Sequence, residues 1–240
     1  MSTSGGIGGG GGGLSSATVQ IDGSAISTLN SVPVELVAAP NSGHCIVPVV
    51  WTAEYVAGPC AYVFPGLVSL FYGAPALGAP VGAGGIQTAF NWNSAAAPTS
   101  GWTNTIGLIG QVAPDPANVN GAAVNLAAAT GDATVYGPID TTTLNDGGSG
   151  YAAGDTGTID GNQYGSAAAY VVDTVDGGGA VLTYHVTDPG DGYTTATGVT
   201  TTPGGSQPGA GSGFTVDVTI VAALGDTLTI TLYYLTQTIV

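Results

Sequence analysis

The end of the chain shows the clearest alternation of apolar and polar positions. Within residues 226–240, Leu228, Ile230 and Leu232 alternate with threonines. This pattern predicts one β-strand with a buried face and a polar face. A strand needs a sheet to join, and the segment just before it is rich in Gly and Asp. We therefore expect it to pair with strands from the first half of the chain.

Shorter segments with strand character fill the first half of the chain. They are rich in β-branched and aromatic residues, and Gly, Pro, Asn and Asp separate them at short intervals. Pro65 and Gly66 predict a break within one of them. No segment shows sustained helical periodicity with caps, although residues 121–130 are compatible with one short helix. The pattern predicts an all-β fold, an antiparallel β-sandwich of jelly-roll-like type, with strands in residues 17–22, 34–39, 45–56, 61–73, 86–92, 103–110, 122–129 and 133–136.

Residues 140–222 contain an internal repeat. The segment "GSAAAYVVDTV" at 165–175 matches "GSGFTVDVTIV" at 211–221, and a hairpin with the turn "DGGG" is predicted over 170–186. Units of about 40 residues are too small to stand alone, so we expect both to pack as one β module. A turn with the same residues occurs twice, 42 positions apart, as Asp146, Gly148, Gly150, Tyr151 and then Asp188, Gly190, Gly192, Tyr193.

The repeat and the C-terminal strand together predict the domain organisation. Residues 17–139 plus 223–240 form a β-sandwich that anchors the protein, and residues 140–222 are a duplicated module inserted into it. Residues 1–16 form a Gly-rich N-terminal arm. Two interpretations of the arm remain open, a disordered tail and an extended arm that lies along a partner.

The charge of the chain narrows the classes of partner. There is no Lys or Arg, and 15 acidic residues give a formal net charge of −15. Nucleic-acid binding needs cations that displace phosphate counterions, and an anionic membrane surface repels an acidic chain. The N-terminus lacks the basic and apolar regions of a signal peptide, and prolines and Glu54 interrupt the apolar stretch 45–77. We expect no nucleic acid partner and no membrane insertion.

Candidate catalytic and metal-binding residues are few. His44 and His185 lack the spacing of a metal site. The only glutamates, Glu35 and Glu54, are the candidates for a glycosidase pair. Eight aspartates between 140 and 191 suggest either a Ca²⁺ site or turns opened by Asp side chains, and turns are favoured because no calcium-loop spacing occurs. We expect no catalytic residue, no metal site and no cofactor.

Four further residues admit two interpretations each. Cys45 and Cys60 are either a disulfide pair or free thiols. Tyr151 and Tyr193 are either interaction residues, as exposed platforms for a sugar, or core anchors packed beneath their turns. The repetition of the same backbone pattern around each Tyr favours the core anchor.

Two groups of motifs carry a resemblance to a known class of proteins. The segments "GGSGYAAGDTGTI" and "DPGDGYTTATGVT" resemble the Gly–Tyr β repeats of tailed-bacteriophage virion proteins. The segment "VPVELVAAPNSGHCIVPVVWTAEY", with "VSLFYGA" and "GDTLTITLYYLTQTIV", resembles small phage structural proteins. The complete lack of Lys and Arg departs from ordinary members of that class.

The resemblance implies a function and a set of partners. It implies a non-catalytic β-sandwich protein of the virion, assembled in the host cytoplasm, that decorates the capsid or forms a head fibre. The implied partners are the major capsid protein or other virion proteins and further copies of the chain, for instance in a trimer. The alternative is a tail-fibre or tail-tip protein that adheres to host glycan. A third class, an enzyme or a surface-layer module, is tested by assaying polysaccharide hydrolysis.

Overall fold

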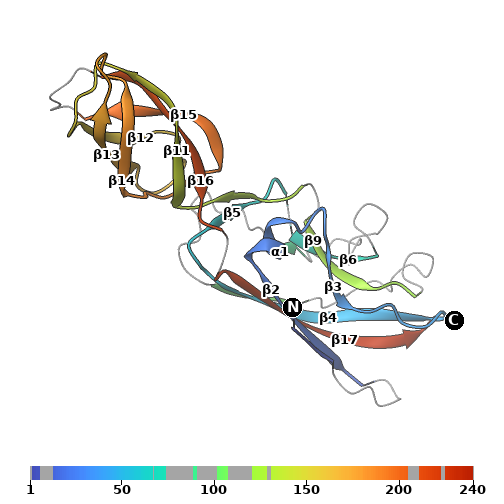
Figure 1. The fold of residues 1–240 in the computed structure, drawn as a ribbon. Helices are drawn as coiled ribbons and strands as arrows, with labels where there is room; N and C mark the ends of the chain where they lie inside the picture. Colours follow the sequence, from blue (N-terminus) through green and yellow to red (C-terminus); the bar gives the residue numbers. More distant parts are fainter. Residues whose placement is uncertain are drawn as a thin grey trace. The chain divides into compact units, whose positions relative to one another are not determined.

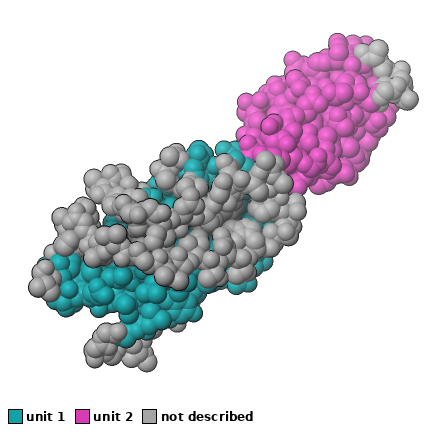
Figure 2. Space-filling view, turned by 180° about the vertical axis from the view of Figure 1, so that it is seen from behind, with its two compact units in different colours: residues 1–58, 62–134, 224–240 teal, residues 59–61, 135–223 magenta. Residues whose placement is uncertain are grey.

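The computed structural model describes residues 2–5, 13–66, 68–73, 89–90, 102–107, 121–128, 131–204, 211–222 and 225–239. The chain divides into two compact units (Figure 2). Unit 1 comprises residues 1–58, 62–134 and 224–240, and unit 2 comprises residues 59–61 and 135–223. The module predicted at 140–222 therefore corresponds to unit 2. The described residues are almost entirely antiparallel β-structure, which confirms the predicted all-β fold class.

The C-terminal strand β17 lies at the centre of a five-stranded sheet in unit 1 (Figure 1). It pairs on one side with β2 and on the other with β4, from Thr227 opposite Val56 to Thr238 opposite His44. The prediction that this strand joins strands of the first half is confirmed. The order of the sheet is β1 (Ser2–Gly5), β2 (Ser15–Asp22), β17 (Thr227–Thr238), β4 (His44–Val56) and β8 (Trp102–Gly107).

Part of the N-terminal arm belongs to this sheet. β1 pairs with β2, from Ser2 opposite Gln20 to Gly5 opposite Ala17. The described start of the arm is therefore an edge strand on its own chain. This differs from both predicted interpretations, a disordered tail and an arm along a partner. The rest of the Gly-rich run, residues 6–12, lies outside the described residues.

A second sheet of unit 1 completes the sandwich. Its order is β3 (Val34–Val37), β9 (Val124–Ala128), β6 (Val68–Tyr72) and β7 (Ala89–Phe90). The Tyr72 hydroxyl of β6 donates to the Ile46 carbonyl of β4 at 2.7 Å, which links the two sheets. Burial of apolar side chains is the main force that holds such sheets together. The buried residues of the two sheets include Val19, Ile21, Trp51, Ile230 and Leu232, and Leu36, Val68, Leu70, Val124 and Leu126.

Local predictions in unit 1 had mixed outcomes. The break at Pro65 and Gly66 is confirmed, because β5 (Ala61–Val63) ends before them and β6 begins after them. The alternative of a helix over 121–130 is wrong, because β9 lies there and pairs with β3 and β6. Sequence patterns missed α1 (Gly23–Ser27), a helix of five residues. β10 (Thr134–Tyr136) pairs with β5 where the chain passes from one unit to the other.

Unit 2 is a nearly closed six-stranded barrel (Figure 1). The strands at the two ends of its sheet are also bonded to each other: Ile139 N donates to the Pro189 carbonyl at 3.2 Å, and Tyr151 N donates to the Gly179 carbonyl at 2.9 Å. Closure satisfies backbone groups that an open edge would leave exposed. The order is β11 (Ile139–Ser149), β16 (Ser212–Ile220), β15 (Ala196–Pro203), β12 (Thr156–Ile159), β13 (Ala168–Val175) and β14 (Val181–Asp188).

The two sequence repeats of unit 2 are related by a pseudo-two-fold axis. The first repeat supplies β11, β12 and β13, and the second supplies β14, β15 and β16; exchanging the repeats reverses the strand order onto itself. The first strand of each repeat pairs with the last strand of the other, β11 with β16 and β14 with β13. Neither repeat can therefore complete its own sheet, which explains physically why the repeats occur as a pair.

Candidate functional site

The two Gly–Tyr turns have the same backbone structure. Asp146 Oδ1 accepts from Gly148 N at 2.9 Å, and Asp188 Oδ1 accepts from Gly190 N at 2.9 Å. The first glycines have φ values of 61° and 58°, a left-handed conformation that favours Gly. The prediction that aspartates open these turns is confirmed. In the first repeat β11 continues through this motif to Ser149, still paired with β16, whereas in the second repeat β14 ends at Asp188.

The structure places Tyr151 and Tyr193 in the core of the module, with 4% and 2% of their surface exposed. The Tyr193 hydroxyl donates to the Ile159 carbonyl at 2.6 Å and accepts from Ala168 N at 2.8 Å. Burial raises the pKa of the Tyr193 hydroxyl. Because both rings are buried, neither is a surface on which a sugar can stack. Both act as the core anchors that the repetition favoured.

The Tyr151 ring packs in an aromatic cluster around Phe214. The rings of Tyr151, Tyr170 and Tyr184 lie edge-on to Phe214, with centroids 6.0, 5.1 and 5.0 Å away. Within the described residues, the Tyr151 hydroxyl has no hydrogen-bond partner. Burial first, and then the neighbouring Tyr151, raise the pKa of Tyr170 to about 12. The Tyr170 hydroxyl is therefore neutral at physiological pH.

Two further aspartates of the module, Asp176 and Asp160, accept hydrogen bonds from nearby donors. Asp176 accepts from Gly178 N and Ala180 N in the β13–β14 turn, both at 2.8 Å. Asp160 accepts from the hydroxyls of Thr200 and Thr202. In the part of the chain that the structure describes, no group of three or more His, Cys, Asp or Glu residues is arranged to hold a metal ion.

The candidate catalytic residues lie apart. Glu35 lies on β3 and Glu54 on β4, in different sheets, and both side chains are exposed. His185 Nδ1 lies 2.8 Å from Asp173 Oδ1 at an exposed position. The structure thus does not bring the two glutamates together on one sheet, and it joins His185 to a single surface carboxylate. Cys45 and Cys60 are both buried and are not joined by a disulfide; the Cys60 thiol donates to the Val221 carbonyl at 3.5 Å.

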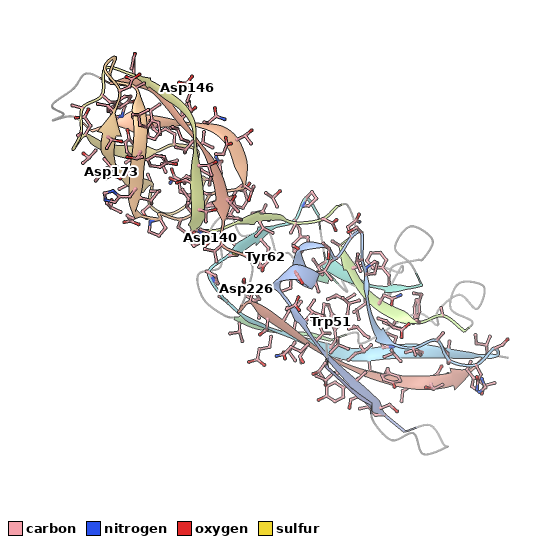
Figure 3. All side chains as sticks on the ribbon, in the orientation of Figure 1. Trp51, Tyr62, Asp140, Asp146, Asp173 and Asp226 are labelled. Atoms are coloured by element: carbon pink, nitrogen blue, oxygen red, sulfur yellow. The ribbon has the colours of Figure 1, made fainter. Side chains whose placement is uncertain are left out.

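One buried carboxylate was not singled out from the sequence. Asp226 is completely buried in unit 1, at the point where the chain returns from the inserted module (Figure 3). Its oxygens accept from the Tyr55 hydroxyl at 3.1 Å, from the Tyr62 hydroxyl at 2.9 Å and from Gly58 N. A buried carboxylate requires such partners. Gly58 and Tyr62 lie on either side of residues 59–61, which belong to unit 2, so Asp226 joins the returning chain to the part of unit 1 that flanks this short segment.

Comparison of the chain with protein-family models, with curated proteins and with solved structures finds no match in any of the three. Among the described residues, no helix has the length and apolar character that crossing a membrane requires.

Proposed function

We propose that the chain is a non-catalytic structural protein of a tailed-phage virion, either a capsid decoration protein or a head-fibre protein. The sandwich unit anchors the protein on the particle, and the inserted module is exposed to the medium. The major capsid protein or another virion protein is the partner.

The observation that carries this proposal is the insertion of a complete pseudo-symmetric barrel into a sandwich. The module leaves unit 1 after residue 134 and re-enters it at residue 224, where Asp226 binds Gly58 and Tyr62 of unit 1 and so fixes the returning chain. Such an arrangement lets one unit hold a partner while the other keeps its own core. Buried Asp226 in unit 1 and buried Tyr193 in unit 2 bind neighbouring residues, and such bonds serve the fold.

The chemistry of the surface is consistent with binding through shape and backbone pairing. The chain has a formal charge of −15 and no Lys or Arg, so its own side chains cannot form a salt bridge through a cation of that kind. A basic shell would attract it and raise the association rate. The alternative, adhesion to host glycan through Tyr151 and Tyr193, has both of its assigned rings in the module core.

Immunogold electron microscopy tests the proposal. Antibodies against the purified chain should label capsids of intact tailed phage from the source of the sequence, and pre-adsorption with the chain should remove the label. Label confined to tail tips would support the adhesin alternative. Unlabelled particles would overturn the proposal.

A second experiment tests the division of labour between the units. A variant with residues 135–223 replaced by a short Gly–Ser linker should still bind particles stripped of the native protein. Tryptophan fluorescence provides the folding control for unit 1, because Trp51, Trp92 and Trp102 all lie in that unit. Binding lost by a folded variant would contradict the anchoring role of the sandwich.

A further inference from the structure

The outer face of the five-stranded sheet carries a regular array of hydroxyl side chains. On β2, β17 and β4, the residues that alternate with the buried ones are aligned by strand register, and none of them is buried. Thr18 Oγ1 and Thr231 Oγ1 lie 3.0 Å apart across two strands. We call this set the hydroxyl face; its four rows are Ser16–Tyr233–Val50, Thr18–Thr231–Thr52, Gln20–Thr229–Glu54 and Asp22–Thr227–Val56.

The register of the outer strands extends the two central rows. Thr105 of β8 pairs with Thr52, and Ser4 of β1 pairs with Thr18. In the next row, Thr103 of β8 pairs with Glu54. Residues that carry a hydroxyl group thus occupy all five positions of the Thr18–Thr231–Thr52 row.

Two of the twelve positions of the hydroxyl face are acidic, Asp22 and Glu54, and none is basic. Two copies of a chain at −15 repel each other wherever their carboxylates meet, and neither has a Lys or Arg to neutralise them. Hydroxyl groups both donate and accept, so a hydroxyl surface can bind an identical surface.

We propose that the hydroxyl face binds the hydroxyl face of a second copy of this chain. The two-fold axis lies in the plane of the face and is perpendicular to the strands, between the Thr18–Thr231–Thr52 row and the Gln20–Thr229–Glu54 row. Each strand then lies over the same strand of the second copy. The first row faces the second copy's fourth row, and the second row faces its third row. This inference does not rest on the proposed function.

The exchange of rows makes the face complementary to itself. Val50 lies against the second copy's Val56, which joins apolar side chains. Thr52 lies against the second copy's Glu54, where a hydroxyl donates to a carboxylate. Ser16 meets the second copy's Asp22 in the same way. A two-fold interface requires this self-complementarity, and charge-assisted hydrogen bonds strengthen it.

The size of the face fits a weak dimer. Five strands about 4.8 Å apart and seven residues of about 3.4 Å each span roughly 24 Å by 24 Å. The footprint of about 600 Å² per copy lies below the roughly 800 Å² per partner of a standard stable interface. We therefore expect association that depends on concentration, strengthened where copies are held side by side.

Sedimentation velocity over a concentration series tests the dimer. The unaltered chain should shift from monomer to dimer, and Thr231→Glu should remain monomeric because it places two new charges at the centre of the interface. Thr219→Glu, at an exposed strand position of the inserted module, adds the same charge and should behave as the unaltered chain. Trp51 fluorescence controls for folding. A monomer at every concentration, or dimerisation of Thr231→Glu, overturns the proposal.

Cross-linking tests the register. Facing sheets lie about 10 Å apart, beyond the roughly 4–7 Å between Cα atoms that a disulfide spans, so a short bis-maleimide is the probe. A mixture of Val50→Cys and Val56→Cys chains should give a covalent heterodimer, and each variant alone should give much less. Equal cross-linking of a single variant, or none in the mixture, overturns the arrangement.

Discussion

The two Gly–Tyr turns of the inserted module share one backbone but place their tyrosine hydroxyls in different surroundings. Tyr193 reaches between β12 and β13, where the Ile159 carbonyl and Ala168 N bind its hydroxyl. The matching position to Ala168 in the second repeat is Phe214, whose ring packs against Tyr151. The turn is thus fixed by backbone geometry, and the surroundings of the tyrosine hydroxyl differ with the residue at the matching position, Ala168 or Phe214.

The difference between Ala168 in the first repeat and Phe214 in the second also decides how the core is filled. The barrel has one interior, and Phe214 of the second repeat occupies it with the edges of three tyrosine rings around it. A second Phe at position 168 has no room to do the same, because Ala168 is itself fully buried. Pseudo-symmetry of the backbone is therefore compatible with asymmetry in the packing of side chains.

The largest expected effect is that of Phe214→Ala, which makes the second repeat resemble the first. Deleting a fully buried ring leaves a cavity, and we expect a loss of about 3–5 kcal/mol in the free energy of unfolding of unit 2. Phe214→Leu should cost roughly 1.5 kcal/mol. Hydrogen exchange of the backbone amides of β13 and β16 monitors unit 2, and tryptophan fluorescence monitors unit 1, which contains all three tryptophans. A loss for Phe214→Ala no larger than for Phe214→Leu would contradict the role of the ring.

The next effect tests whether the two Gly–Tyr turns are structurally equivalent. Alanine at Gly148 or Gly190 would have a left-handed φ, and its Cβ would overlap Ser212 O or Ala168 N, respectively. We expect both variants to lose about 3 kcal/mol of stability. Gly198→Ala is the control, because Gly198 has a φ of 63° and its Cβ would meet nothing closer than 4.0 Å. It should lose only about 1 kcal/mol in denaturant unfolding. Unequal losses at 148 and 190 would break the equivalence.

A smaller effect separates the two tyrosines. Tyr193→Phe removes a hydroxyl that binds the Ile159 carbonyl and Ala168 N, and both would be left buried. We expect a loss of about 1–3 kcal/mol. Tyr151→Phe removes a hydroxyl without a hydrogen-bond partner in the described residues and should be nearly neutral. Thermal unfolding of the two matched variants measures the difference, and equal losses would refute the comparison.

Sequence patterns predicted the features that depend on local chemistry. The alternation of Leu228, Ile230 and Leu232 marks a strand with one buried face, and the paired Asp and Gly residues mark the turns. The repeat itself also predicted a module that needs both of its halves. These features follow from residues whose preferred backbone conformation does not depend on residues far away in the sequence.

Other features depend on distant residues and were not predicted. The pairing of β11 with β16 follows from barrel closure, and no local pattern of β11 specifies that partner, whereas the β13–β14 hairpin was predicted over 170–186 from its turn. Asp226 has the sequence surroundings of an ordinary turn aspartate, yet Tyr55 and Tyr62, far away in the sequence, make it a buried hydrogen-bond acceptor. The helix Gly23–Ser27 is too short to show periodicity.

The smallest effect concerns the β13–β14 turn, whose backbone is hydrogen-bonded to the first Gly–Tyr turn. Tyr151 N binds Gly179 in the β13–β14 turn, and Asp176 holds that turn through Gly178 N and Ala180 N. The hydrogen bonds from Ala180 N and then Gly178 N lower the pKa of Asp176 from its ordinary value of 3.8. Its carboxylate therefore stabilises the fold fully above pH of about 4, and this contribution is lost as the pH falls through the lowered pKa.

Asp176→Asn keeps an oxygen acceptor but removes the charge. The stability difference between the unaltered chain and Asp176→Asn should be small at pH 6 and should shrink as the pH falls from 5 to 2. Melting temperatures of the two proteins in matched buffers measure it, and the tryptophan transition of unit 1 should not change between them. A difference that stays constant or grows on acidification would show that the turn does not depend on the ionised carboxylate. The first Gly–Tyr turn would then owe its position to the hydrogen bond from Tyr151 N to the Gly179 carbonyl and to the packing of Tyr151 against Phe214, without a contribution from the Asp176 charge.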